Sequence, residues 1–216
     1  LLNRELGLKG SYMDGRLDFR AALFHMDRDD AQLESWVWDS ANFLWIGFLD
    51  NVDGSNWGAE IELNFRLSDR VELFGSLGLL QTEIKEITTF DLNLDGFVTR
   101  RGIDQAKSPE WQYNLGGDFF FSDSLRARLE FEGRDDSRYG YYHNEDIGSY
   151  NLVNASLSYR FGRTELQLWV RNLTDEDYAV HGLFFGNDPR KGWINESYYQ
   201  YGEPRVYGIS AKYFLE

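Results

Sequence analysis

The side chains best spaced for metal chemistry are those of Asp91, Asn93 and Asp95, which alternate with leucines and precede Gly96. Carboxylate and amide oxygens at this spacing, followed by a glycine, form the first half of a calcium-binding loop. The full pattern requires a Glu at its twelfth position, where this sequence has Gly102, and no helix is predicted on either side. We therefore predict a surface turn here and keep a calcium site as the alternative.

The sequence offers little for catalysis. Its histidines are His25, His143 and His181, and neither a His-Glu-x-x-His nor a Gly-x-Ser-x-Gly motif occurs. There is no cysteine, which excludes a disulfide framework and a thiolate metal site. We predict that the protein is not an enzyme and uses no cofactor, with a hydrolase built on a Ser-His pair formed by folding as the alternative.

Aromatic residues make up 17% of the chain, and many lie in long stretches between predicted strands. Rigid aromatic faces beside hydrogen-bonding groups are what a site for a small-molecule ligand needs. The alternative is an aromatic girdle at a membrane interface together with packing between loops. The residues that we predict to contact an extracellular ligand are Trp36, Trp38, Trp45, Tyr141, Tyr142, His143, Phe184, Phe185, Trp193, Tyr198 and Tyr199.

These candidates depend on strands for their position, because short turns and long connections alternate along the chain. The predicted short turns are Asp14-Gly15, 67–70, 122–124 and Gly162-Arg163. The predicted long connections, which hold the candidates, are roughly 39–54, 88–108, 140–148 and 173–203. Short turns at one end and long loops at the other are typical of transmembrane β-barrels of the bacterial outer membrane.

We predict nine strands, at about 4–12, 16–38, 55–66, 71–87, 109–121, 125–134, 149–161, 164–172 and 204–215. A bulge or break is expected within the second strand, at 27–30. The third strand alternates cleanly, so that Trp57, Ile61 and Phe65 share one face with the other apolar residues. An Arg at the midplane of a lipid face costs about 2–4 kcal/mol, so a shift of one residue is strongly disfavoured.

The predicted fold class is all-β, a membrane-spanning antiparallel up-and-down β-barrel. A soluble β-sandwich that buries the same apolar face is the alternative. No run approaches the 18 apolar residues of a helical membrane span, and the mean hydropathy is -0.52. The net charge of -14 argues against a nucleic-acid partner, whose phosphates would be repelled.

An odd number of strands places the two ends of the chain on opposite sides of the membrane. Short turns face the periplasm, so the C-terminus is predicted to be periplasmic and the first strand to begin outside. Bacterial single-chain barrels have an even number of strands. We therefore expect about nine strands of a larger barrel in the bacterial outer membrane.

Two segments near the C-terminus suggest a family. Asn172, Leu173, Asp175 and Tyr178, within 169–178, resemble the penultimate-strand signature of TonB-dependent outer-membrane receptors. The segment 201–208, which contains Gly202, Pro204 and Arg205, looks like the entry to that family's final strand. Segments 5–9, 15–17, 56–62 and 108–111 also fit the family in order and spacing. One departure is Leu215, which occupies the place of the terminal aromatic residue.

The resemblance implies a barrel of about 22 strands. Residues 1–216 would be its C-terminal portion, with the plug domain and signal peptide absent. It further implies TonB-energised uptake of a scarce ligand, most often a ferric siderophore or similar iron complex, while haem, cobalamin and oligosaccharides stay open. The implied partners are the TonB complex acting through the plug, the plug itself, outer-membrane lipid and lipopolysaccharide, and an extracellular small molecule. A passive porin-like or structural barrel is the alternative function.

Charged residues on the polar strand faces are predicted to line the lumen. They could contact a plug or line a pathway, but a solvated wall of mutual ion pairs is the favoured interpretation. These residues are Glu60, Glu62, Arg66, Arg126, Arg128, Glu130, Glu132, Arg134 and Arg160.

Overall fold

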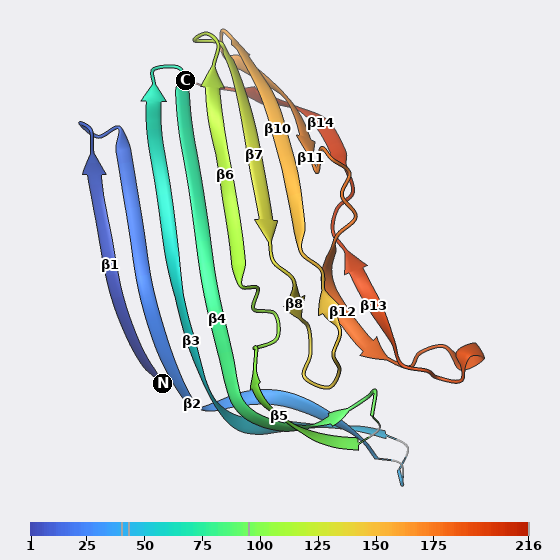
Figure 1. Ribbon diagram of the computed structural model, residues 1–216. Helices are drawn as coiled ribbons and strands as arrows, with labels where there is room; N and C mark the ends of the chain where they lie inside the picture. Colours follow the sequence, from blue (N-terminus) through green and yellow to red (C-terminus); the bar gives the residue numbers. More distant parts are fainter. Residues whose placement is uncertain (40, 43, 95, 216) are drawn as a thin grey trace.

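Antiparallel strands make up most of the chain (Figure 1). The computed structural model describes residues 1–39, 41–42, 44–94 and 96–215. Within these residues nine strands form one continuous wall in chain order, and β5 (Gly96–Ile103) pairs with the far end of β4. The nine are β1 (Leu2–Tyr12), β2 (Leu17–Asp39), β3 (Leu44–Ser68), β4 (Val71–Asp91), β6 (Trp111–Phe120), β7 (Leu125–Arg134), β10 (Tyr150–Phe161), β11 (Thr164–Arg171) and β14 (Val206–Tyr213).

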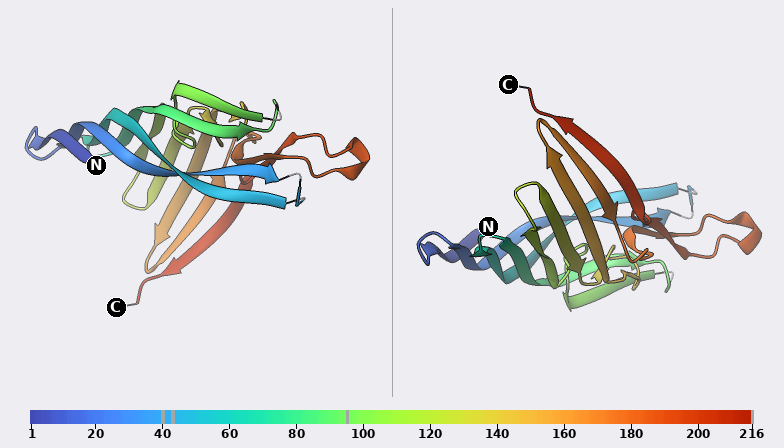
Figure 2. Two further views of the ribbon diagram at one scale, coloured as in Figure 1. Left: turned by 90° about the horizontal axis from the view of Figure 1, so that it is seen from below. Right: turned by 90° about the horizontal axis from the view of Figure 1, so that it is seen from above.

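The four short turns lie together at one end of the wall, the upper end in Figure 1. They comprise residues 13–16, 69–70, 121–124 and 162–163. Gly15 and Gly162 have φ of 79° and 57°, a left-handed conformation that glycine adopts without steric cost. Figures 1 and 2 show an open, curved wall whose edges are β1 and β14, and these two strands are not paired within the described sheet. An open arc of strands is a partial barrel.

The register aligns side chains of one kind in rows across neighbouring strands. One row on the apolar face consists of Leu8, Ala21, Ile61, Leu77 and Tyr113. The adjacent row on the opposite face consists of Lys9, Arg20, Glu62, Ser76 and Asn114. Large residues of the apolar face are freely exposed, for example Leu6 at 74% and Ile209 at 73%, as a lipid-facing surface requires.

Two of the four predicted long connections, 39–54 and 88–108, are largely strand, which corrects that part of the sequence interpretation, whereas 140–148 and 173–203 are mainly loop and contain shorter strands. The β2–β3 pairing continues to Asp39 and Leu44, and β5 pairs with β4 as far as Asp91 and Gly96. Shorter pairs are β8 (Ser137–Arg138) with β9 (Asp146–Ile147), and β12 (Ala179–Phe185) with β13 (Glu196–Tyr201). Cross-strand pairing in these hairpins satisfies the backbone N–H and C=O groups of the paired residues. The predicted irregularity at 27–30 is confirmed by a register shift between Arg28 and Ala31.

Beyond the wall, the β2–β3 hairpin bends across β4 and β5, at the lower end in Figure 1. The Ser35 and Thr89 hydroxyl oxygens are 2.5 Å apart and fully buried, which fixes where β2 crosses β4. Val52, Ile84 and Ile87 form a buried apolar cluster between these strands. The packed core therefore lies at the long-loop end and not in the wall. No helix in the described part of the chain is long and apolar enough to cross a membrane.

Ser76 and Leu77 are neighbours on β4 that point to opposite faces. Leu77→Arg puts a charge on the apolar face, which costs about 2–4 kcal/mol at a bilayer midplane. Ser76→Arg puts the same charge in a hollow shared with Glu60 and Glu62, where it is readily accommodated. In the full-length gene product, we expect Leu77→Arg to lower the amount of folded, heat-modifiable protein in the outer membrane, and Ser76→Arg to leave it near wild type. Equal amounts for the two variants would contradict a lipid-facing Leu77.

Candidate functional site

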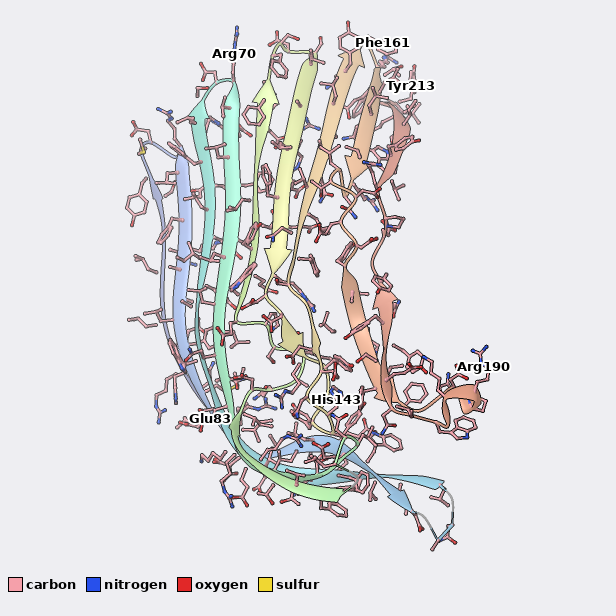
Figure 3. All side chains as sticks on the ribbon, turned by 45° about the vertical axis from the view of Figure 1, so that its right-hand side comes forward. Arg70, Glu83, His143, Phe161, Arg190 and Tyr213 are labelled. Atoms are coloured by element: carbon pink, nitrogen blue, oxygen red, sulfur yellow. The ribbon has the colours of Figure 1, made fainter. Side chains whose placement is uncertain are left out.

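His143 lies at the centre of the long-loop end, in the connection between β8 and β9, far from Arg70 and Phe161 at the short turns (Figure 3). It is fully buried. Its ring is 4.3 Å from the Tyr139 ring, 4.8 Å from Tyr142 and 5.2 Å from Phe184, measured between centroids. Because Phe184 belongs to β12, this aromatic cluster ties two separate connections together.

Two glycines make room for this cluster. A Cβ atom on Gly140 would lie 2.5 Å from Nε2 of His143, and one on Gly182 would lie 2.7 Å from the Tyr139 ring. Neither distance is tolerated by real side chains, so any other residue at these positions would push the rings apart. The close packing of His143 therefore depends on both glycines.

The His143 ring is held in its neutral form. The backbone N–H of Glu145 donates to Nδ1 of His143 at 3.0 Å, so the ring proton resides on Nε2. That Nε2 is buried and has no hydrogen-bond partner among the described residues. Burial, and then the positive charges of Arg138 and Arg100, lower the pKa of His143 to about 4.

Arg100 links the same connection to the β4–β5 hairpin. It forms a buried ion pair with Asp91, and it donates to the carbonyl oxygen of Tyr141 and to Oδ1 of Asn144, each at 3.1 Å. The backbone N–H of Leu92 donates to the carbonyl oxygen of Tyr142 at 2.9 Å. Arg100 was not among the predicted site residues, since nothing in the local sequence pairs it with residues some forty positions away.

The Asp91 carboxylate is fully engaged, which argues against the calcium alternative. Its Oδ1 accepts the backbone N–H groups of Asn93 at 2.8 Å and Leu94 at 3.1 Å, and its Oδ2 binds Arg100. Although burial opposes it, bonding to Arg100 and to these N–H groups lowers the pKa of Asp91. Asp95 lies outside the described residues. Elsewhere in the described chain no three acidic, His or Cys side chains group around a metal position.

The predicted ligand-binding residues divide into buried and exposed sets. His143 and Phe184 are buried, Tyr142 packs on His143, and the Tyr141 hydroxyl accepts the Ala106 N–H at 3.0 Å. Phe185 and Tyr198 pack on each other at 5.1 Å. These residues therefore hold the hairpins together. Those whose side chains are open to a ligand are Trp36 (39% exposed), Trp193 (60%) and Tyr199 (37%). The side chains of Trp38 and Trp45 lie outside the described part of the structure.

The connection between β12 and β13 is a built turn around a short 3-10 helix, η1 (Pro189–Lys191). Asp188 caps it by accepting the Arg190 backbone N–H at 2.9 Å, and Lys191 pairs with Glu196 at 2.5 Å. Trp193 has a φ of 62°, which a bulky residue adopts only when its surroundings enforce it. The turn thus holds the exposed Trp193 in a defined place.

The residues of the family resemblance form a clasp between the end of β11 and the start of β14. Asn172 is 3% exposed and has a φ of 49°. Its Nδ2 donates to the carbonyl oxygens of Glu176 at 2.9 Å and Glu203 at 3.1 Å, and its Oδ1 accepts the Glu176 N–H at 2.8 Å. One amide side chain therefore bridges three backbone groups.

A second set of contacts completes the clasp. Asp175 accepts the Arg205 backbone N–H at 2.9 Å and pairs with its guanidinium at 3.2 Å. Arg205 also reaches the carbonyl oxygen of Leu173, and Pro204 adjoins it just before β14. A Cβ atom on Gly202 would collide with the Tyr178 ring. All of these contacts are made within the chain. They stabilise the connection between the end of β11 and the start of β14.

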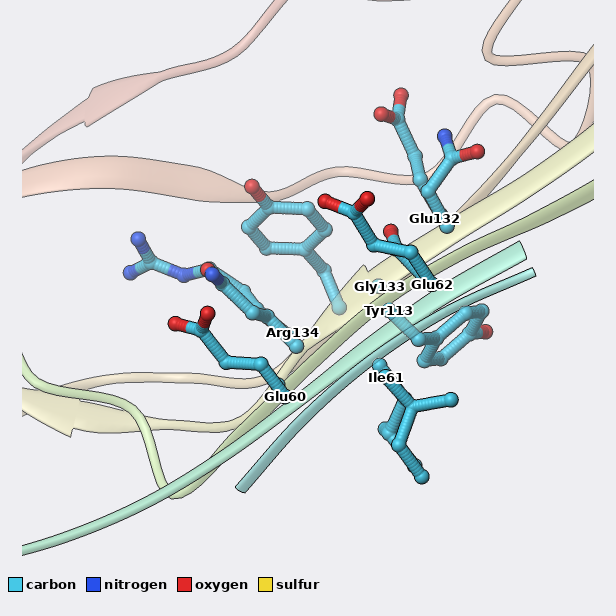
Figure 4. A pocket seen from close by; sticks show the side chains of 13 residues that line it. Glu60, Ile61, Glu62, Tyr113, Glu132, Gly133 and Arg134 are labelled. Carbon is cyan, nitrogen blue, oxygen red and sulfur yellow. The ribbon is translucent and has the colours of Figure 1, made fainter. Parts of the chain in front are cut away.

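The polar face of the wall carries a hollow of about 460 Å³ (Figure 4). Glu60, Glu62 and Arg134 point into it, whereas Ile61 and Tyr113 point to the other face. Arg134 lies over the Tyr150 ring at 5.4 Å, and its buried Nε has no hydrogen-bond partner in the described chain. Many other predicted lumen charges form ion pairs, such as Arg128 with Asp118 at 2.9 Å and Arg66 with Glu72 at 3.1 Å.

Comparison with known proteins identifies the family. Residues 2–173 match the family described as TonB dependent receptor-like, beta-barrel, and the chain belongs to it. The ferric-pyoverdine M114 receptor PbuA of Pseudomonas sp. (strain M114) is 27% identical over 219 residues. That similarity covers 96% of this chain and 24% of the receptor, so the chain spans about a quarter of the relative's length.

Solved receptors share the fold. The ferric yersiniabactin uptake receptor FyuA from Yersinia pestis superposes with a TM-score of 0.73 at 18% identity, over 97% of this chain and 29% of that one. The pyoverdine receptor FpvA from Pseudomonas aeruginosa PAO1 gives 0.68 at 18% identity, over 99% and 29%. The predicted fold class and family are therefore confirmed.

Removing the Asn172 side chain tests the clasp. Asn172→Ala removes three hydrogen bonds to backbone groups of Glu176 and Glu203, each worth about 0.5–1.5 kcal/mol, and keeps a left-handed φ without an Asn to favour it. We expect lower resistance of the full-length protein to urea unfolding in detergent micelles. The matched control is Asn187→Ala, at an exposed position in the β12–β13 connection, which should change little. Equal urea midpoints for the two variants would refute the clasp.

Acid should loosen the aromatic cluster. The pKa of His143 is about 4 in the folded protein and about 6.5 in an unfolded chain. As the pH falls, the unfolded connection is therefore protonated before the folded one, and protonation favours unfolding. The packing is thus fully stable above pH 6.5 and loses stability as the pH falls towards 4. We expect proteolysis within 139–147 to accelerate over this range, with a protease whose own pH dependence is measured on an unfolded substrate. His143→Asn keeps an acceptor for the Glu145 N–H without titrating, and should show a flatter pH dependence.

Proposed function

We propose that this chain is the C-terminal part of the barrel of an outer-membrane receptor that imports a ferric siderophore or a related metal complex. One observation carries the proposal. The long-loop end is a packed assembly of hairpins that presents Trp36, Trp193 and Tyr199 to solvent, above a wall with a polar inner face. A passive pore has no need of such a structured outer end. The family consists of receptors and not enzymes.

The named relatives support the ligand class. PbuA is a receptor for ferric pyoverdine, FyuA takes up ferric yersiniabactin, and FpvA is described with pyoverdine bound. Two of these ligands are named as ferric complexes, and pyoverdine is named for two of the receptors. For this chain we therefore propose a metal chelate and leave its identity to experiment.

The proposed setting follows from the two faces and two ends of the wall. The apolar face meets lipid, the long-loop end faces the medium and lipopolysaccharide, and the short turns and the C-terminus face the periplasm. The polar face, with the Arg134 hollow, faces a plug domain supplied by the rest of the receptor. The TonB complex acts on that plug, and nucleic acid is not a partner because the net charge is -14.

Uptake measurements test this proposal. In the native host, deletion of the gene should abolish uptake of one radiolabelled ferric chelate out of a panel of siderophores, ferric citrate and haem. A plasmid copy should restore it, and loss of TonB should abolish it again, because the transport needs energy from the inner membrane. Normal uptake of every compound in the panel by the deletion strain would count against a receptor for an iron chelate. Uptake that persists without TonB, with open conductance in planar bilayers, would instead favour a porin-like barrel.

A further inference from the structure

Trp36 on β2 lies flat over a position that has no side chain. Three atoms of its six-membered ring lie 3.1 to 3.3 Å from where a Cβ atom of Gly47 would stand. Gly47 is the cross-strand partner of Trp36 on β3. One face of the indole is therefore covered by the Gly47 backbone, and the side chain keeps 39% of its surface exposed. This arrangement is a flat aromatic platform open to solvent.

Glu34 lies on the same face of the hairpin. It is two residues before Trp36 in a stretch of β2 with regular pairing, so both side chains point the same way, about 7 Å apart. Glu34 is exposed, and no cation or hydrogen-bond donor pairs with it among the described residues. Burial, and then the charge of Glu34, raise the pKa of Tyr142.

The hairpin that carries the platform is anchored from its other face. Ser35, between Glu34 and Trp36, is fully buried against Thr89 of β4. Val52 of β3 packs in the cluster with Ile84 and Ile87, and Leu33 adds to it. The two exposed side chains therefore sit on a supported element, as a binding site requires.

The surrounding charge is strongly negative. Segments 27–54, 83–110, 135–149 and 172–205, which make up the long-loop end, contain 23 Asp and Glu but only 9 Lys and Arg, whereas the rest of the chain has 13 of each. Several of the basic residues are already paired, including Arg100 with Asp91, Arg101 with Glu86 and Arg205 with Asp175. The field at this end attracts cations and repels anions.

We propose that the Trp36 indole and the Glu34 carboxylate form a binding site for an organic cation, a quaternary ammonium or guanidinium group on the ligand. A cation over an indole face is attracted by the ring quadrupole, and quaternary ammonium groups are typically bound by aromatic side chains. The carboxylate supplies the counter-charge. This inference rests on the proposed function for the ligand that carries the group, and it adds that this ligand presents a positive charge to β2 and β3.

A neutral ring or sugar could also stack on Trp36, but it would not need Glu34 or the acidic surroundings. The two possibilities are distinguished by comparing a charged and an uncharged probe of the same shape. Choline and its uncharged carbon isostere, 3,3-dimethyl-1-butanol, provide that comparison. Neither probe requires transport, so this test can fail while receptor function stands, and the uptake test can fail while cation binding stands.

The experiment uses the full-length protein in detergent, labelled with 5-fluorotryptophan and observed by ¹⁹F NMR. The Trp36 resonance is assigned with Trp36→Phe, and that of Trp193, which is also exposed, serves as an internal control. We expect choline to shift the Trp36 resonance with a half-saturation at least about tenfold lower than the alcohol. The advantage should shrink in 0.5 M salt, and Glu34→Gln should remove most of it.

Three results would overturn the proposal. Equal half-saturation of the Trp36 shift by choline and by the alcohol would mean that binding at Trp36 depends on shape and not on charge. An unchanged choline response in Glu34→Gln would remove the carboxylate from the site. An equal response at Trp193 would mean that choline binds exposed indoles at this end without selection.

Discussion

The wall depends on backbone hydrogen bonding between antiparallel neighbours. In a lipid environment an unpaired N–H or C=O group costs several kcal/mol, so each strand must pair fully with the next. That pairing fixes the register, and the register places every second side chain on the same face. The rows that run from Leu8 to Tyr113 and from Lys9 to Asn114 follow from it. The wall therefore needs no core of its own, and both its faces are free for lipid and lumen.

The long-loop end is governed by different physics. Outside the bilayer, water can satisfy the backbone, so order there has to come from burial. The structure provides two apolar clusters for this purpose, one around Val52, Ile84 and Ile87 and the other around Tyr139, Ile147 and Phe184. His143 packs against the second cluster, and its neutral ring contacts residues from separate connections. Exposed aromatic side chains are then presented from hairpins supported by these clusters, which explains why many aromatic residues at this end do not face solvent.

The wall was predictable from the sequence because its signal is local. Alternation and turn residues located all nine strands, and residues 125–134 match β7 at both ends. The extra hairpins were missed because they are supported by contacts from one hairpin to another, such as Ser35 with Thr89, that no local pattern contains. For the same reason the aromatic candidates could not be divided into buried and exposed sets. The ion pair of Asp91 with Arg100, nine residues further along the chain, argues against the calcium alternative and could not be read from the spacing of the acidic residues.

The residues that carry the family resemblance are not the aromatic residues that we propose to contact a ligand. Asn172, Asp175, Tyr178, Gly202 and Arg205 are identified by the family pattern, and their contacts all serve to join β11 to β14. Such a joint is required whatever the receptor imports, so it can match relatives whose named ligands differ. Trp36 and Trp193 lie outside that pattern, on hairpins whose length and sequence the wall does not constrain. A motif that secures the last strand can therefore reveal the family, whereas the chemistry of a ligand has to be inferred from the exposed side chains of the long-loop end.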